Sequence, residues 1–528
     1  MELHMKTDNV ELSLLPLELN IVAPGLELAL AQEGISAVSS SDWESQRRKY
    51  PSTMSERGKF LLYDSSMTGY QSVCRSCVPG QKMIDVSVLR KGWDTDPFQA
   101  LIDTQTRRGG WRINAKLVTE MVSRYPKGAI RRKLLKALRR KIEDEGGIWL
   151  CVSPYPYPYR SAFNFRIDYD EYQAFDFTSI VKQCETLQSL TSHYVCASAF
   201  QQQPQVLDVL KEFDVGGHGW IHRTYRDRMQ NHGNIQRGME WLQGQNLDVE
   251  GFVSPHGIWN RGLGCVLEDL GIRFSSEFGL AHDELPFFPY MESCFSGRLQ
   301  SSDEPVDCLR PQSSSDHSGY FSSVLQLPVH PVCLGVLLEA GICDPSIISD
   351  YFFSVIERKF QEGSPAFLYG HPTRRLGQWP VVISTAYRVA QQYPQMWKTT
   401  LRNFAQWWHQ RNRLCPVVNG RHDGYEVFVN ASSQNWTAAV QLWRGDKVAL
   451  IPLDGTRQLL CPEFLDFQSC CSRNEADGVP QSVPISWKTK LRNWLEIESM
   501  SEINQKRISR VSQLFTKSQR SKSESIRK

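Results

Sequence analysis

The chain has little net charge and little that marks it for export or for a membrane. Lysine and arginine together number 60, and aspartate and glutamate number 57, so the formal charge is only +3. A field this weak gives no reason to expect a nucleic-acid partner. No run of about 18 apolar residues is present, so we expect no transmembrane helix. The first 20 residues do not combine a basic start with an apolar core, and they predict no signal peptide.

The 14 cysteines lack the regular spacing of a disulfide framework. Cysteines scattered in this way are typical of a reducing compartment, so the sequence predicts a cytoplasmic protein. Cys74 and Cys77 form a single CxxC pair without a second pair to complete it. That pair is weak evidence for either a zinc site or a redox site.

A length of 528 residues is too great for one hydrophobic core, and the composition changes along the chain. We therefore expect four regions. They are an N-terminal α/β domain of unknown role (1–150), a catalytic domain (151–412), a small β-rich region (413–490) and a basic, serine-rich tail that we expect to be disordered (491–528).

The longest region alternates strand-like and helical segments between about residues 160 and 410. AFNFRIDYD precedes FTSIVKQCETLQSL, HYVCASAF precedes QVLDVLKEF, and VGGHGWIH precedes NIQRGMEWLQG. Repeated alternation of this kind predicts a parallel sheet, closed into a (β/α) barrel. Working residues of such barrels lie at the carboxyl ends of the strands.

In the N-terminal region we also expect a helix over 114–125.

The stretch FRIDYDEY places Asp168 and Asp170 at the end of the first predicted strand of the barrel. Side chains alternate along a strand, so these two carboxylates share one face. Like charges held this close repel unless a proton, a cation or hydrogen bonds intervene. The pair is either an exposed strand end without a function or one part of a cation site.

A second stretch, GGHGWIHRTY, supplies histidines that suit a cation. His218 and His222 are four residues apart, and on a helical turn that spacing places both rings on one face. Two histidines and one carboxylate leave open positions on an ion, which suits catalysis. We expect Asp170, His218 and His222 to bind Zn²⁺, although Co²⁺, Ni²⁺ or Fe²⁺ would also bind. Asp168 is then free to take a proton from water that the ion activates.

Two further stretches offer groups for the same reaction. GFVSPHGIWN places the backbone N–H of His256 after a proline, where it can face a developing oxyanion. FLYGHPTRRLG places His371 at a strand end, where it can protonate a leaving amine.

Taken in this order, the four stretches resemble the polysaccharide deacetylase family, also called the NodB homology domain or carbohydrate esterases. The resemblance covers about 250 residues. It implies a distorted (β/α) barrel, with Asp168 as the base, Asp170, His218 and His222 as metal ligands, His256 as the oxyanion donor and His371 as the acid. The spacing Asp168–Tyr169–Asp170 is more similar to the D-x-D, deformylase-like branch. That family usually has an arginine at the start of the third motif to pair with the base, and Val253 stands there in this chain.

The resemblance implies a metal-dependent hydrolase that removes an N-acetyl or N-formyl group from an amino sugar. The substrate would be an amino sugar or glycan, either free or linked to a lipid or a nucleotide. Two alternatives remain open. One is a carbohydrate-binding protein on an inactive scaffold, and the other is a non-haem iron enzyme, because two histidines and a carboxylate also serve there.

Overall fold

The computed structural model describes most of the N-terminal and central parts of the chain. The described residues are 17–20, 23–35, 37–39, 60–66, 81–292, 319–414, 416–421, 424–429, 436–453, 458–460, 465–469 and 479–484. Cys74, Cys77 and the basic tail 491–528 lie outside them. Among the described helices, none is long and apolar enough to cross a membrane.

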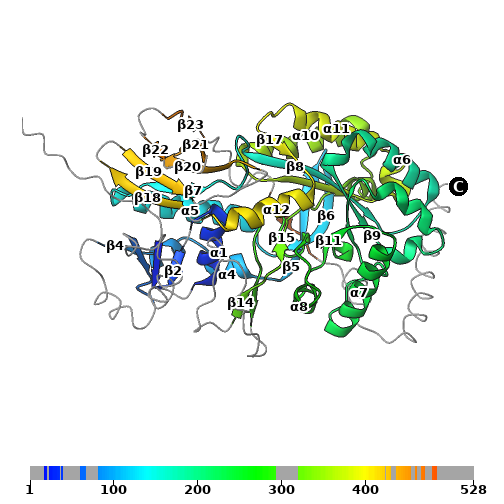
Figure 1. Ribbon diagram of the computed structural model, residues 1–528, viewed down its shortest axis with the longest axis horizontal. Coiled ribbons are helices and arrows are strands. Elements are labelled where there is room, and N and C mark those ends of the chain that lie inside the picture. Colours follow the sequence, from blue (N-terminus) through cyan, green and yellow to red (C-terminus); the bar gives the residue numbers. More distant parts are fainter. Residues whose placement is uncertain are drawn as a thin grey trace, which may run out of the picture.

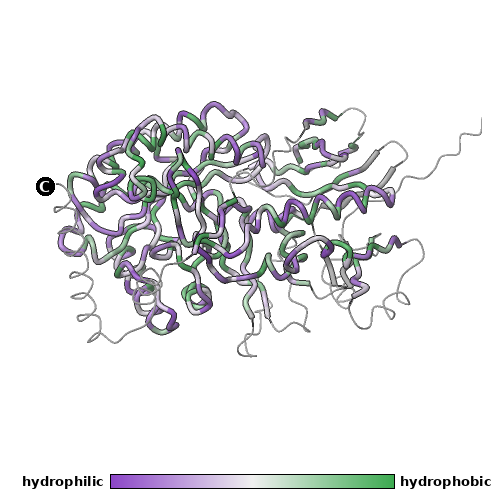
Figure 2. Tube along the Cα trace, turned by 180° about the vertical axis from the view of Figure 1, so that it is seen from behind, coloured by the Kyte–Doolittle hydropathy of each residue, from purple (hydrophilic) through white to green (hydrophobic). Residues whose placement is uncertain are grey.

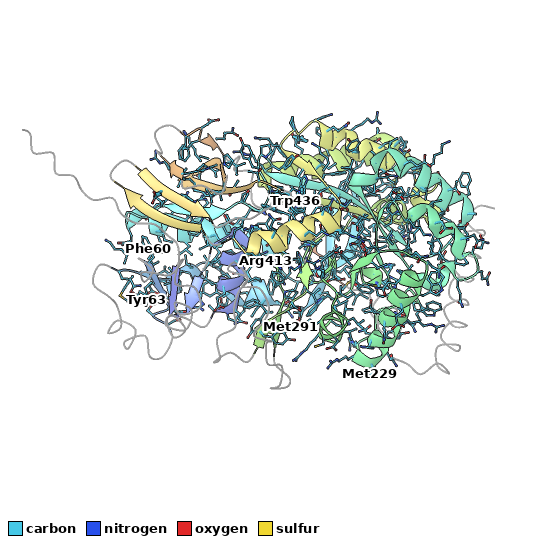
Figure 3. The ribbon with its side chains drawn as sticks, viewed as in Figure 1. Phe60, Tyr63, Met229, Met291, Arg413 and Trp436 are labelled. Atoms are coloured by element: carbon cyan, nitrogen blue, oxygen red, sulfur yellow. The ribbon has the colours of Figure 1, made fainter. Side chains whose placement is uncertain are left out.

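A small parallel sheet forms the first part of the chain and lies at the left of Figure 1 in blue. Its strand order is β2-β1-β3-β4. The aliphatic side chains of β3 are buried, and Figure 3 labels Phe60 and Tyr63 at its two ends. The elements are β1 (Leu17–Asn20), α1 (Pro24–Glu33), β2 (Ala37–Ser39), β3 (Phe60–Tyr63) and β4 (Lys82–Asp85).

A β-hairpin and a long helix follow, where we had expected a helix over 114–125. The segment is instead β6 (Lys116–Ser123), paired antiparallel with β5 (Thr106–Ile113). Asn114 and Ala115 both have positive φ, which is the backbone of a tight hairpin turn whose twist suits the two strands. The helix prediction was wrong because that turn and the pairing with β5 outweigh local helix propensity. The short α4 (Pro97–Ile102) precedes the hairpin and α5 (Lys127–Asp144) follows it.

The central sheet is parallel and curls as a half-barrel, as the alternation of segments predicted in outline (Figure 1). Its strand order is β15-β12-β11-β10-β9-β8-β16, and β17 pairs with the first residues of β8. The strands are β8 (Ser161–Tyr169), β9 (Thr191–Val195), β10 (Asp214–Gly217), β11 (Val249–Phe252), β12 (Phe274–Ser275), β15 (Leu325–Gln326), β16 (Ala366–Gly370) and β17 (Met396–Lys398).

The two edges of this sheet are linked by one backbone hydrogen bond. In the described part of the chain, β15 and β16 do not pair as strands. The N–H of His330, just beyond β15, donates to the carbonyl of Phe367 in β16 at 2.8 Å. Among the described residues, the hydroxyl of Tyr369 in β16 also donates to the carbonyl of Pro331 at 3.1 Å, so isolated hydrogen bonds replace a ladder at this seam. A short antiparallel pair, β13 (Tyr290–Glu292) with β14 (Gly319–Phe321), lies between β12 and β15 in the sequence.

Helices surround the sheet, and in the tube of Figure 2 hydrophilic and hydrophobic residues alternate along them. The segment QVLDVLKEF, which we expected to be an α-helix, is the 3₁₀ helix η4 (Pro204–Leu210), so this prediction was wrong in type. The helices are α6 (Ala174–Cys184), α7 (Arg228–Gly244), α8 (Arg261–Asp269), α9 (Leu334–Glu339), α10 (Pro345–Glu362), α11 (Val381–Gln391) and α12 (Leu401–Asn412).

Some of the strands that follow the central sheet in sequence pair with strands that precede it. β20 pairs antiparallel with both β21 and β7, and β7 comes directly before the barrel in sequence. β24 pairs with β5 of the early hairpin. The domain boundaries that we inferred from the sequence stay a prediction. The strands are β7 (Trp149–Val152), β18 (Pro416–Arg421), β19 (Gly424–Val429), β20 (Ala438–Arg444), β21 (Lys447–Leu453), β22 (Gln458–Leu460), β23 (Gln468–Ser469) and β24 (Gln481–Ser482).

A buried arginine ties the last barrel helix to the N-terminal part. The side chain of Arg411, in α12, is fully buried. Its guanidinium donates to the carbonyls of Ala31 and Gln32 in α1 and of Val152 and Ser153 around β7, at 3.0–3.3 Å. The carbonyl of Ala31 also accepts from the N–H of Gly34, so Arg411 is its second donor.

Replacing Arg411 with methionine should lower the free energy of unfolding by about 3 kcal/mol or more, because each buried group left without a partner costs about 1–3 kcal/mol. The melting temperature of the variant measures the effect. Arg388→Met, at an exposed arginine in α11, is the matched control and should change little. Equal melting temperatures for the two variants would contradict the structural role of Arg411.

Candidate metal centre

The residues that the sequence singled out meet at one edge of the central sheet. Asp170 directly follows β8, His218 directly follows β10, and His371 directly follows β16. Parallel strands all end at the same edge, so residues up to 200 positions apart are brought together there. His256 lies in the short turn Pro255–Gly257 that comes after β11.

Asp170, His218 and His222 form the cluster in which a metal ion would fit. One ligand atom from each residue lies within 4.8 Å of the other two. The Nε2 atoms of both histidines lie 3.2 Å from the same oxygen, Oδ1 of Asp170. A tetrahedral Zn²⁺ site with bonds of about 2.0–2.1 Å requires ligand atoms roughly 3.3 Å apart, so the spacing suits zinc. His218 is buried, whereas Asp170 and His222 are half-buried and accessible from one side.

The two histidines are not presented by a helical turn, as we had expected from their spacing. Residues 218–222 form an irregular turn instead, and only the subsequent α7 is helical. Gly219 has a positive φ of 85°, and a Cβ there would lie 2.9 Å from the side-chain amide of Asn234. That amide in turn accepts from the N–H of Ile221 and donates to its carbonyl. A glycine and an asparagine thus shape a turn that brings both rings to Asp170.

A hydrogen bond identifies which nitrogen of His218 is available. Nδ1 lies 2.7 Å from the backbone carbonyl of Val253, which can only accept, so Nδ1 carries the hydrogen. In the neutral ring, Nε2 then holds a lone pair and faces the carboxylate of Asp170 at 3.2 Å. Two acceptors in contact repel each other unless a cation or a proton lies between them. Among the described residues, Nε2 of His222 is likewise buried without a hydrogen-bond partner.

Electrostatics in the cluster favour a charged carboxylate. Burial by itself would raise the pKa of Asp170, but the charge of His371 and the nearby imidazoles of His218 and His222 hold this pKa well below its ordinary value. Burial lowers the pKa of His222, which keeps that ring neutral and its lone pair available. One carboxylate and two neutral imidazoles are a suitable donor set for a divalent transition metal, and Zn²⁺ fits it by ligand type.

Asp168 has a different environment, although it is only two residues away. Its side chain is buried, and Oδ2 accepts from Nε and Nη2 of Arg166 at 3.2 and 2.8 Å. The third nitrogen of Arg166, Nη1, donates to the carbonyl and hydroxyl of Ser276 at the end of β12. The other oxygen, Oδ1, is buried and has no hydrogen-bond partner among the described residues. Arg166 therefore orients Asp168 and leaves one of its oxygens free.

A buried glutamate, Glu277, supports the turn that contains His256. His256 has a positive φ of 60°, and the hydrogen bonds of the turn run from Gly257 to Ser254 and from Ile258 to Pro255. These bonds leave the N–H of His256 unused. The N–H of Ser254 donates to Oε1 of Glu277 at 3.1 Å.

The carboxyl group of Glu277 is completely buried. Burial raises its pKa to about 7, although hydrogen bonds from Ser275 and Ser254 oppose the change. The imidazole ring of His256 is exposed and lies 4.6 Å from the ring of His222, measured between centroids. The structure thus places His256 beside the cluster.

His371 approaches the cluster from β16. Its Nε2 lies 3.7 Å from Oδ2 of Asp170, and its Nδ1 lies 3.2 Å from Nη1 of Arg375. Burial lowers the pKa of His371, but the charge of Asp170 and a hydrogen bond with Cys333 raise it to about 9. A cation bound by Asp170 would take up the carboxylate charge that raises this pKa. Arg375 can only donate, so it favours a ring with a lone pair on Nδ1.

Sequence reasoning missed three residues that support this site. They are Arg166, Glu277 and Arg375. Arg166 carried a signal, because a charged residue in an otherwise buried strand needs a partner. Glu277 offered a similar signal, being an acidic residue beside the strand-like IRFSS. Nothing in the sequence identified Arg375 rather than the adjacent Arg374 as the partner of His371.

Comparisons with known proteins give only distant similarity. No family model matches the chain, and no curated protein matches it. A Mycobacterium smegmatis protein assigned as a polysaccharide deacetylase is 13% identical, with a TM-score of 0.36 over 48% of this chain and 91% of that one. PuuE allantoinase is 14% identical, with a TM-score of 0.37 over 49% of this chain and 93% of that one.

A third solved structure is a CE4 family pseudoenzyme from Bacillus anthracis. It is 12% identical, with a TM-score of 0.28 over 48% of this chain and 69% of that one. Similarity this low carries no functional argument by itself. What this site does must follow from the geometry of its own residues.

Purified protein should bind one Co²⁺ or Zn²⁺ ion per chain. His218→Ala, His222→Ala and Asp170→Asn should each lose the ion, because each removes one of three ligands. Metal content after dialysis and the visible spectrum of the Co²⁺ form measure this. His232→Ala, which removes a histidine of α7 outside the cluster, should bind normally. Stoichiometric metal in the His218/His222 double variant would rule out this ligand set.

Proposed function

We propose that this chain is a metal-dependent amidohydrolase that removes an N-acetyl or N-formyl group from an amino sugar. The observation that supports hydrolysis best is the free Oδ1 of Asp168, held beside a three-ligand cluster by an arginine that occupies the other oxygen. The sugar and the acyl group come from the resemblance of the four sequence motifs to carbohydrate deacetylases. The identity of the sugar and of the acyl group is therefore the more specific part of the proposal.

In the proposed reaction, the role of the metal site is to activate water and the amide carbonyl. A divalent cation bound by Asp170, His218 and His222 supplies Lewis acidity toward water and the amide carbonyl. The hydrogen bond from His218 to Val253 fixes the ring so that Nε2 points to the cation, as partners of metal-binding histidines commonly do. Burial of His218 keeps that arrangement out of solvent.

Proton transfer is divided between two residues. Asp168 accepts the proton of the attacking water on its free Oδ1, while Arg166 keeps the carboxylate oriented. His371 donates a proton from Nε2 to the leaving nitrogen, because an amine leaves poorly as an anion. The unused N–H of His256 donates to the oxygen that becomes negative when the carbonyl carbon is attacked.

The two alternative functions make different demands on the site. A non-haem iron enzyme needs the two histidines and Asp170, but it has no use for a second carboxylate with a free oxygen. An inactive binding scaffold has no need for Arg166 to orient that carboxylate. Oxygen-dependent turnover with Fe²⁺ would favour the first alternative, and sugar binding without turnover by the metal-loaded protein would favour the second.

Two asparagine variants separate the two carboxylates. Asp168→Asn should retain the metal yet lose about 10²–10⁴-fold in kcat, because it removes the general base. Asp170→Asn should lose the metal first. Metal content and the rate of release of acetate from N-acetylated chito-oligomers measure the two effects. If both variants show the same metal content, the division of roles is wrong.

His371→Ala tests the proton donor. The variant should lose about 10²–10⁴-fold on an N-acetyl amide but far less on an activated aryl acetate, whose leaving group needs no proton. Both substrates are measured with one metal-loaded preparation. Equal losses on the amide and the ester would indicate general damage and remove His371 from the mechanism.

A further inference from the structure

A small cavity lies between the start of α5, which precedes the barrel in sequence, and the second half of α10. The centres of water molecules can occupy about 30 Å³ of it, whereas one water needs roughly 10–15 Å³, so the cavity has room for a small ion. The charged side chains that line it are Arg132, Asp283, Arg358, Lys359 and Glu362. Three cations against two carboxylates leave one positive charge in excess, so an anion suits the cavity better than a metal ion.

Arg132 has a donor for which the protein provides no acceptor. Its Nη1 atom is buried and has no hydrogen-bond partner among the described residues. Oε2 of Glu362 lies 3.7 Å from this nitrogen, which is an ion-pair contact but too long for a hydrogen bond. Since a buried N–H of a charged group is unfavourable without an acceptor, a ligand oxygen in the cavity would satisfy it.

The two cations of α10 are held loosely. Nη2 of Arg358 lies 3.4 Å from Oδ2 of Asp283, and its Nε lies 3.9 Å from Oε1 of Glu362. Nζ of Lys359 lies 3.3 and 3.4 Å from the same two carboxylates. Well-formed charge-assisted hydrogen bonds are about 2.7–2.9 Å long, so these donors remain able to bind a ligand as well.

The start of α5 adds donors from the backbone. The first N–H groups of a helix have no acceptor within the helix, and the positive end of the helix favours an anion. Pro126 gives this end no side-chain cap, and in the described part of the chain no hydrogen bond uses the N–H groups of Gly128 and Ala129, which both line the cavity. A Cβ on Gly128 would lie 3.3 Å from Nη1 of Arg132, so the glycine keeps space open beside that nitrogen.

The two carboxylates limit which anion can bind. Burial by itself would raise the pKa of Asp283, but the charges of Lys359 and His330 hold this pKa well below its ordinary value. Burial would also raise the pKa of Glu362, but the charges of Lys359 and Arg132 lower it. Both groups are therefore charged acceptors at neutral pH. Sulfate has only acceptor oxygens and would be repelled by them, whereas hydrogen phosphate has a hydroxyl that can donate to one of them.

We propose that this cavity binds a hydrogen-phosphate group and prefers it to sulfate. The oxygens of the ligand accept hydrogen bonds from Arg132, from Arg358 and from the first N–H groups of α5. Its hydroxyl donates to the carboxylate of Glu362 or of Asp283. The bound ion joins α5 to α10 and so strengthens the contact between a helix that precedes the barrel and a helix of the barrel. This inference does not depend on the metal centre or on the proposed hydrolysis.

Calorimetric titration of the full chain tests the preference. Inorganic phosphate should bind with one ion per chain, and sulfate about 10–100-fold more weakly at the same ionic strength, because a hydrogen bond to a charged group is replaced by a repulsive contact. His222→Ala, which lacks a proposed metal ligand, should bind phosphate with unchanged affinity. Equal affinities for the two anions, or loss of phosphate binding in His222→Ala, would overturn the inference.

Glycerol phosphate distinguishes a free ion from a phosphate group on a larger molecule. Tighter binding of the ester than of inorganic phosphate would identify a phosphorylated molecule as the ligand, and weaker binding would identify the free ion. Both results agree with the inference. Failure of both compounds to bind would overturn it.

Arg132→Met locates the bound ion, because methionine has a stem of similar length and no donor. Its affinity for phosphate should fall about 10-fold or more, since the variant removes a buried charge-assisted hydrogen bond. Arg140→Met removes an arginine of the same helix whose side chain is 61% exposed, and it is the matched control. Equal phosphate affinities of the two variants would show that the ion binds elsewhere and would overturn the inference.

Glu362→Gln tests the reason for the preference, because it keeps the size of the side chain and removes its charge. Sulfate should bind the variant about 10-fold more tightly than it binds the parent protein, so that the preference for phosphate narrows. Asp283→Asn makes the same test for the second carboxylate, and the melting temperature of each variant verifies that it is folded. An unchanged ratio of the two affinities in both folded variants would show that neither carboxylate faces the ligand, and the inference would fall.

Discussion

The hydrogen bond from Nδ1 of His218 to the carbonyl of Val253 determines the chemistry of the cluster. It joins the residues that follow β10 and β11, two neighbouring strands, at the edge where the sheet ends. Because it places the hydrogen of the ring on Nδ1, it leaves a lone pair on Nε2 directed at Asp170. A buried acceptor facing another acceptor is unfavourable without a positive charge between them. The sheet edge therefore holds a lone pair and a carboxylate against each other, an arrangement that a cation between them would stabilise.

The same edge also explains why residues remote in the sequence support one another. Arg166 of β8 reaches Ser276 beyond β12, across the curled sheet, and this long contact is possible only because the sheet bends its strand ends toward one another. Glu277, next in the chain, holds the turn that presents the N–H of His256. One segment after β12 thus supports both Arg166 and the turn that contains His256. In the mechanism proposed above, a shift of that segment would disturb the base and the oxyanion donor without touching a metal ligand.

The sequence predicted the parallel sheet and the positions of the chemical groups better than the details that connect them. Strand ends could be located because FRIDYDEY, VGGHG and FLYGH combine an apolar run with polar residues directly after it. The hairpin at 106–123 was missed because local composition favoured a helix, whereas the pairing with the preceding strand β5 is not visible in the 114–125 segment alone. The turn at 218–222 was misjudged for a related reason, since a spacing of four residues suits a helix but Gly219 and Asn234 impose another backbone. The contact of Arg375 with His371 depends on space at Gly335, in a helix 40 residues earlier, which no local pattern contains.

Two carboxylates only two residues apart acquire different roles because the sheet surrounds them differently. Asp168 lies within β8, where a buried arginine of the same strand takes one oxygen and leaves the other without a partner. Asp170 lies just beyond the strand end, where three histidines from two other segments converge on it. A general base needs an oriented lone pair that no hydrogen-bond donor occupies. A metal ligand needs neighbouring ligands that can bind the same ion. The end of the strand separates these two environments, so a single residue, Tyr169, is enough to separate the two proposed functions. The buried ring of Tyr169 points to the opposite face of the strand, where its hydroxyl contacts His193 of β9 and anchors the strand end that both carboxylates require.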